Sequence, residues 1–218
     1  MDLTLLKNTL DSLNLPSFRY RQIVKNYYSG RYLNFDQMTD LSLDLRKKLS
    51  ETFPLLSVIE KTTVGDESVQ KALLELSDGQ KIESVFMDYE EWLTACVSSQ
   101  VGCPLGCSFC ATGKMGFKRN LTPQEIVDQI LYWNQKIYPK YIGRVVFMGM
   151  GEPLLNFDNV LRASQIMMDD FGYGLSKRRV TLSSSGLVPE LEKLAQVSYM
   201  SLAIALHARV VVSPLVAS

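Results

Sequence analysis

Three cysteines on one short loop constrain this chain more than any other feature of its sequence. Cys103, Cys107 and Cys110 lie within eight residues and follow the spacing C-x3-C-x2-C. Gly102 and Gly106 allow the backbone to bend tightly around a bound group. Three thiolates held in this way can bind three irons of a [4Fe-4S] cluster, and the fourth iron then has no protein ligand. The spacing therefore predicts a metal cluster with one open coordination site.

A zinc knuckle and a chance grouping are the alternatives to this cluster. Structural zinc takes four ligands, usually as two pairs of Cys or Cys/His residues. The only histidine of the chain, His207, is far from the cysteines in the sequence, and no second pair exists. The donor set therefore favours iron and sulfur over zinc.

The composition is that of a folded protein of one domain, or of one domain with a small appendage. The chain has 218 residues, of which 46% are hydrophobic and 21% charged, so it can bury a core. The formal net charge is zero, which argues against a generally basic nucleic-acid binder but not against local basic patches. Three of the four cysteines are clustered, which is a poor disulfide framework and fits a reducing compartment.

No targeting or membrane segment is predicted. The first residues lack a basic region followed by an apolar core. The most apolar stretch, residues 199–218, is interrupted by His207, Arg209 and Pro214 and does not resemble a membrane span. We expect a cytoplasmic monomer without membrane attachment.

The residues around the cysteines indicate a family. The C-x3-C-x2-C spacing is that of the radical S-adenosylmethionine (SAM) superfamily. The longer run CVSSQVGCPLGCSFCATG, residues 96–113, resembles the RlmN family of dual-specificity RNA methyltransferases. This resemblance extends from near the N-terminus to about Ala208. It implies methylation of C2 of an adenine in 23S rRNA and tRNA, a [4Fe-4S] cluster and SAM as cofactors, and an electron donor such as flavodoxin.

Residues 1–55 are predicted to form a helical accessory domain. Leu3, Leu6, Leu10 and Leu13 recur at helical spacing. Aromatic and basic residues alternate further on, at Arg19, Tyr20, Arg21, Lys25, Tyr27, Tyr28 and Arg31. They could stack on bases and bind phosphates, or they could belong to an ordinary amphipathic helix whose basic residues snorkel. The family resemblance implies contact with RNA.

Residues 56–96 change to a period of two, which is typical of β-strands. Glycine-containing turns at 65–66 and 77–79 predict hairpins. The predicted strands are Val58–Val64, Val69–Leu76, Lys81–Met87 and Trp92–Val97.

From residue 97 to about 208 strands alternate with helices. Thr122, Pro123 and Glu125 form a helix start with a capping box. Alternation of this kind implies parallel strands whose carboxyl ends gather the functional loops at one edge. The predicted strands after the cysteine loop are Arg144–Met148, Arg179–Ser183 and Met200–Leu206. The sequence therefore predicts an α/β fold: a partial radical SAM (β/α) barrel with an N-terminal helical domain and a β-hairpin segment.

The family resemblance assigns four further residues to SAM. The turn Gly149–Pro153 resembles the one that receives the SAM amino group, where Gly151 allows close backbone approach and Glu152 offsets the ammonium charge. Without its context, such a turn is a plain connection between strand and helix. Ser183 matches a serine that contacts SAM, and His207 follows in a matching segment, although a lone histidine is more often structural. In that segment alanine at 205 replaces the serine of the family.

Two residues match the catalytic pair of the family. Cys96 corresponds to the cysteine that resolves the covalent enzyme–RNA intermediate, and Glu83 to the proposed proton acceptor. Taken alone, Cys96 is most simply a small buried hydrophobic residue, and Glu83 a solvated charge on a strand.

Two groups of basic residues lie near the predicted active edge. Lys114, Lys118 and Arg119 follow the cysteine loop, and Lys177, Arg178 and Arg179 precede a strand. They could bind phosphates or remain as solvated surface charges.

The sequence departs from the family pattern at its end. The methyl-carrying cysteine of the family has no counterpart, because no cysteine follows Cys110, and residues 209–218 diverge altogether. We therefore expect a truncated form that lacks this cysteine. An inactive RNA- or metal-binding remnant and a radical SAM enzyme with another substrate are the alternatives.

Overall fold

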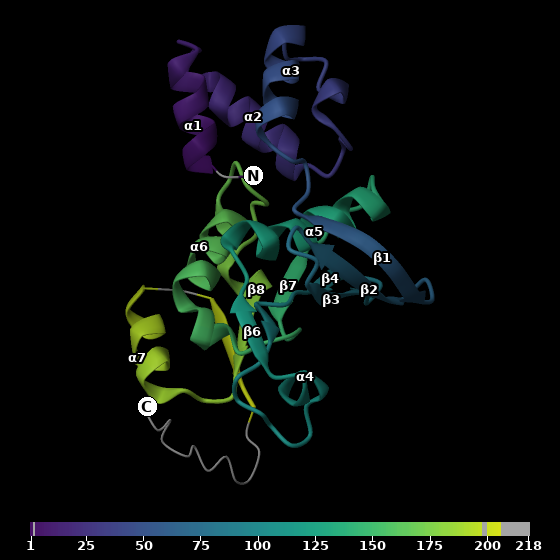
Figure 1. Cartoon of the computed structure of the whole chain (residues 1–218), viewed down its shortest axis with the longest axis vertical. Coiled ribbons are helices and arrows are strands. Elements are labelled where there is room, and N and C mark those ends of the chain that lie inside the picture. The colour runs from purple at the N-terminus through teal and green to yellow at the C-terminus, as the bar shows by residue number, and fades with distance from the viewer. Residues whose placement is uncertain (2, 198–199, 206–218) are drawn as a thin grey trace.

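Two layers make up the molecule in the computed structural model, which describes Met1, residues 3–197 and residues 200–205. Helices α1–α3 form the upper layer in Figure 1, and the sheet with its helices lies below them. No helix in these ranges is both long and apolar enough to cross a membrane.

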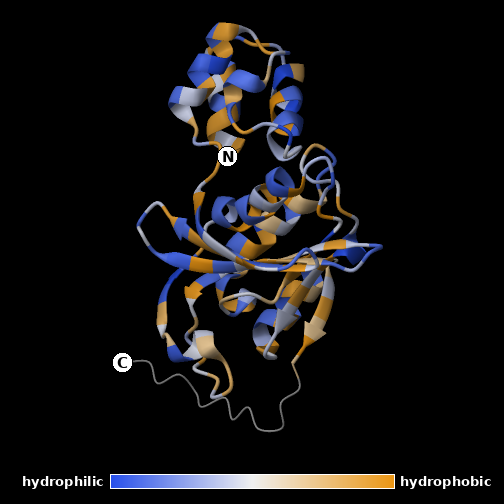
Figure 2. Ribbon diagram, turned by 90° about the vertical axis from the view of Figure 1, so that its right-hand side faces the viewer, coloured by the Kyte–Doolittle hydropathy of each residue, from blue (hydrophilic) through white to orange (hydrophobic). Residues whose placement is uncertain are grey.

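The upper layer has the helical character that the leucine spacing predicts. It contains α1 (Leu3–Ser12), α2 (Phe18–Tyr28), a short 3-10 helix η1 (Phe35–Gln37) and α3 (Leu43–Thr52). Orange and blue segments alternate around these helices in Figure 2, as expected for amphipathic helices. Their apolar sides share one core, which includes Leu6, Leu10, Ile23, Val24, Leu45 and Leu49.

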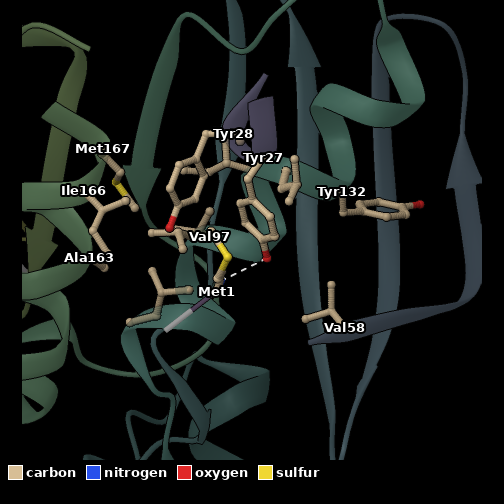
Figure 3. Packing of buried hydrophobic residues seen from close by; sticks show 14 of the residues in the cluster. Met1, Tyr27, Tyr28, Val58, Val97, Tyr132, Ala163, Ile166 and Met167 are labelled. Carbon is tan, nitrogen blue, oxygen red and sulfur yellow. Dashed lines mark hydrogen bonds between the residues drawn. The ribbon is translucent and has the colours of Figure 1, made fainter. Parts of the chain in front are cut away.

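Two tyrosines of α2 fix this layer on the rest of the chain. The Tyr27 hydroxyl accepts a hydrogen bond from the Met1 ammonium at 3.0 Å and donates one to Asp128 at 3.2 Å. Figure 3 shows Tyr27 beside Tyr28 in the buried cluster. Burial and the nearby Asp128 carboxylate raise the pKa of Tyr27 well above its usual value. Both tyrosine rings are buried, so they cannot stack on RNA bases.

One mixed sheet of seven strands forms the centre of the lower layer. Its order is β1-β2-β3-β4-β7-β8-β9. The first three pairings are antiparallel, and β4, β7, β8 and β9 are parallel. The strands are β1 (Val58–Gly65), β2 (Val69–Leu76), β3 (Lys81–Asp88), β4 (Leu93–Cys96), β7 (Arg144–Phe147), β8 (Val180–Ser184) and β9 (Ser201–Ile204). The predicted hairpin segment and the predicted run of parallel strands are thus confirmed.

A second, two-stranded sheet was not predicted. It pairs β5 (Gln100–Gly102) with β6 (Phe117–Asn120). The helices of the lower layer are α4 (Ala111–Lys114), α5 (Pro123–Ile137), η2 (Pro153–Asn156), α6 (Phe157–Met168), η3 (Lys177–Arg179) and α7 (Val188–Val197). The predicted capping box of α5 is confirmed, because Thr122 and Glu125 each accept a hydrogen bond from the backbone of the other.

The two faces of the large sheet differ. On one face, Trp133 of α5 is fully buried, donates to the Ser84 hydroxyl at 3.0 Å and packs against Phe86. Side chains alternate along a strand, so residues 83, 85 and 87 of β3 point to the other face. That second face carries a groove, and we call it the groove face.

Candidate functional site

The cysteine loop connects β5 to α4 and is closed at its base by backbone contacts. The Cys103 N–H donates to the Gly116 carbonyl at 3.2 Å, and the Cys110 N–H to the Cys107 carbonyl at 3.0 Å. Gly102 has a φ of 74°, and a Cβ there would overlap the Gly116 carbonyl oxygen. The chain can therefore form this narrow base only with glycine at position 102.

The three thiols of this loop have the chemistry that an iron–sulfur cluster needs. All of them are free; Cys103 is buried, and Cys107 and Cys110 are half-buried. Burial raises the pKa of the Cys103 thiol, and the charges of Glu152, Cys107 and Cys110 add to the effect. In the described ranges no three ligand side chains are already arranged around a metal site. The donor set fits a cluster, and binding requires the loop side chains to turn toward one another.

The Gly149–Pro153 turn packs directly on the segment that leads into the cysteine loop. The Met150 N–H donates to the Ser98 hydroxyl at 2.8 Å, and the Glu152 N–H to the Gln100 side chain at 2.9 Å. Gly151 has a φ of 97°, and a Cβ there would lie 2.5 Å from the Gln100 Cβ. The structure thus brings the predicted SAM turn and the cysteine loop together.

Glu152 is a buried carboxylate without a basic partner among the described residues. It accepts hydrogen bonds from the Leu154 N–H at 3.1 Å and from the N–H and hydroxyl of Ser185 at 2.9 and 3.0 Å. These bonds fix η2 and the end of β8. They stabilise the charge but do not neutralise it, so the site still favours a cation.

Cys96 and Glu83 lie on the groove face, near the same edge of the sheet. Cys96 pairs with Val85 across β4 and β3, two residues from Glu83. Burial raises the pKa of the Cys96 thiol to about 11, and a hydrogen bond from the Met148 backbone opposes this rise. The half-exposed Glu83 carboxylate forms an ion pair with Lys71 at 3.0 Å.

Ser183 lies on β8 opposite Ala203 of β9, and its side chain is half-buried. The structure describes no hydrogen-bond partner for its hydroxyl, which is therefore available to a ligand. His207 lies outside the described residues. Ala205, which replaces the serine expected there, donates its N–H to the Ser184 carbonyl at 3.0 Å.

Arg119 is not a free phosphate ligand, contrary to one of the sequence interpretations. Its guanidinium binds Glu125 through two hydrogen bonds of 2.8 and 2.9 Å and Asp78 through one of 2.7 Å. Two carboxylates therefore neutralise this charge, and Arg119 joins the hairpin segment to α5.

Buried polar residues that sequence reasoning missed position the loops of the site. Gln129 bonds both the N–H and the carbonyl of Ser98. Asn156 donates to the carbonyls of Ser99 and Leu121, each at 2.8 Å. The sequence did contain one indication of this network. Three polar residues, Ser98–Gln100, directly follow an apolar strand.

Similarity to known proteins agrees with this geometry. The profile of the Radical SAM superfamily matches residues 97–208, so the chain is a radical SAM protein. It resembles the crystal structure of a radical SAM methyltransferase from Sphaerobacter thermophilus, with a TM-score of 0.87 and 38% identity over 95% of this chain and 62% of that one.

The particular family follows from two further matches. The profile of the ribosomal RNA large subunit methyltransferase N-terminal domain matches residues 1–55. The dual-specificity RNA methyltransferase RlmN of Halorhodospira halophila is 45% identical over 199 residues, which is 91% of this chain and 55% of that protein. The chain belongs to the RlmN family and spans about half the length of this relative.

Proposed function

We propose that this chain is the cofactor-binding part of a radical SAM methyltransferase that acts on C2 of an adenine in 23S rRNA and tRNA. Cys103, Cys107 and Cys110 hold the [4Fe-4S] cluster. The observation that carries this proposal is the placement of an unneutralised buried carboxylate, Glu152, beside a loop of three free thiols. A cationic ammonium group and an open iron are the two partners that such a site favours.

The backbone and side chains around the turn hold SAM. Gly151 allows close approach of the turn, Glu152 offsets the ammonium charge and Ser183 offers its free hydroxyl. His207 is proposed as a fourth contact on the family resemblance. A cluster held by Cys103, Cys107 and Cys110 would supply one-electron chemistry to SAM held at this turn.

Glu83 and Cys96 act on the RNA in this proposal. Glu83 is proposed as the proton acceptor on the family resemblance, and its half-exposed carboxylate is within 3.0 Å of the Lys71 ammonium. Cys96 is protonated at neutral pH, since its pKa is about 11, and needs a base before it can react as a thiolate. The methyl-carrying cysteine of the family has no counterpart among these 218 residues, because no cysteine follows Cys110.

The remaining proposals follow from the family. Residues 1–55 form the accessory domain, residues 56–96 the hairpin segment and residues 97–208 the radical SAM core. The partners are 23S rRNA, tRNA and an electron donor of the flavodoxin type, and the protein acts as a monomer in the cytoplasm.

The test is iron and SAM binding measured without oxygen. The parent chain is expected to bind about four irons and to turn brown. Cys107→Ala should lose most of that iron. Cys96→Ala is the matched control, because this cysteine is not a proposed ligand, and it should keep the parent iron content. A colourless chain with one zinc, or equal iron in the parent and Cys107→Ala, would contradict the proposal.

A further inference from the structure

The groove face contains a cavity of about 410 Å³ that the proposed function uses only at one end. This volume is in the range of small-molecule pockets, roughly 300–1,000 Å³. Cys96 and Met148 lie at the carboxyl ends of the parallel strands, next to the proposed active edge. Apolar side chains of Val85, Met87 and Val146 line the middle.

The other end of the groove is basic and aromatic. Arg144 begins β7, Arg179 ends η3 just before β8, and Trp92 precedes β4. The guanidinium carbons of Arg144 and Arg179 lie 4.5 and 4.7 Å from the centroid of the Trp92 ring. Arg144 is four strand residues from Met148, so this end is about 13 Å from the active edge.

No carboxylate neutralises this basic end in the part of the chain that the structure describes. Arg144, Arg178 and Arg179 line the groove and form none of the ion pairs found there. Asp88, at the nearby end of β3, is 4.0 Å from Lys140 instead. Guanidinium groups bind phosphate oxygens through paired N–H donors, so three of them without counter-charge favour a phosphate.

An aromatic surface for a base adjoins these arginines. Tyr89 lines the same end of the groove and is 63% exposed. Aromatic rings beside basic groups are the combination that binds nucleotides through stacking and phosphate contacts. An acidic peptide would use the charges but not the exposed ring.

We propose that Arg144, Arg178 and Arg179, with Trp92 and Tyr89, bind the phosphate and base of a nucleotide, either free or within single-stranded RNA. Where the ligand is RNA, this site rests on the proposed function, but it contains none of the residues assigned to the cluster or to SAM. Its test is therefore independent of cofactor loading.

Trp92 fluorescence provides the test. The chain has two tryptophans, and Trp133 is fully buried, so a ligand-dependent change in emission reports on Trp92. The parent chain is titrated separately with inorganic phosphate, AMP and a six-nucleotide single-stranded RNA. We expect saturable changes with AMP and RNA, and about tenfold weaker binding by the double variant Arg144→Gln/Arg179→Gln. Tighter binding of RNA than of AMP would identify the strand as the ligand; the reverse order would identify a free nucleotide.

Controls separate this site from charge alone and from the cluster. Arg162→Gln, at an exposed arginine of α6, should bind like the parent. Cys107→Ala should also bind like the parent, whether or not the cluster proposal holds. Should the double variant lose its circular dichroism spectrum, Arg178→Gln is used alone and should weaken RNA binding severalfold. Absence of saturable binding, unchanged binding by the folded arginine variant, or equal binding of polyglutamate would overturn the proposal.

Discussion

Single residues determine whether the cysteine loop can form. Gly102 has a left-handed backbone with a φ of 74°, and the Gly116 carbonyl occupies the space of its missing Cβ. Gly79, in a hairpin turn, has nearly the same φ of 78° but no atom within 4 Å of a Cβ. An alanine at position 79 would therefore cost only the strained backbone conformation, whereas an alanine at position 102 would also overlap the Gly116 carbonyl.

A pair of alanine variants tests this difference. Gly79→Ala should destabilise the fold by about 1 kcal/mol, which is the cost of left-handed backbone. Gly102→Ala should cost about 3 kcal/mol, because the loop base must also open. Urea unfolding of the cluster-free chain measures both. Equal losses would show that the Gly116 contact is unimportant.

The reactivity of Cys96 should depend on pH in a defined direction. Its pKa is raised to about 11, whereas unfolded cysteines titrate near 8.5. The folded thiol thus keeps its proton, and folding stability decreases as pH rises above the unfolded value. At pH 8 iodoacetamide should label Cys96 more slowly than Cys107, and the rate should rise toward pH 11. Mass spectrometry of the cluster-free chain measures both labelling rates. Labelling of Cys96 as fast as that of Cys107 at pH 8 would contradict this prediction.

At the scale of elements, one buried acid joins three segments. Asp128 of α5 accepts hydrogen bonds from Tyr27 of α2, from the N–H and hydroxyl of Ser57 at 2.7 Å, and from Gln124. Its side chain has no solvent exposure. The helical layer, the start of the hairpin segment and α5 are therefore held together through one carboxylate.

Removal of this carboxylate should weaken the fold. Asp128→Ala leaves the Ser57 N–H and the Tyr27 O–H without an acceptor, and we expect the free energy of unfolding to fall by about 3 kcal/mol. Asp44→Ala, at an exposed acid in the first turn of α3, is the matched control and should cost about 0.5 kcal/mol. Urea unfolding distinguishes the two, and similar losses would show that Asp128 is not the connecting residue.

Elements with a local signal were predictable from the sequence. The capping box at Thr122, the hairpin strands and the cysteine spacing each depend on residues close in sequence. The β5–β6 sheet, the Glu152–Ser185 bonds and the role of Asp128 depend on contacts between distant residues. The strands β5 and β6, with three and four residues, are also too short for an alternating pattern to be recognised. Hence the cysteines could be proposed as metal ligands from their spacing alone, but the contacts that position their loop could not be predicted.

For the whole molecule, the parallel arrangement of β4, β7, β8 and β9 brings the site together. Cys96, the Gly149–Pro153 turn and the end of β8 follow these strands at one edge, and the cysteine loop packs against them. Arg144 and Arg179 lie where the same strands begin. The groove extends from Cys96, at the carboxyl ends of these strands, to the proposed nucleotide site.

The most direct test of the central claim is electron paramagnetic resonance of the reduced, iron-loaded chain with and without SAM. A cluster held by Cys103, Cys107 and Cys110 leaves one iron open. Addition of SAM should therefore shift the g-values of the signal, and Glu152→Gln should require more SAM for the same shift. A cluster signal that SAM leaves unchanged, or no cluster signal at all, would contradict the claim that three cysteines hold a cluster open to SAM.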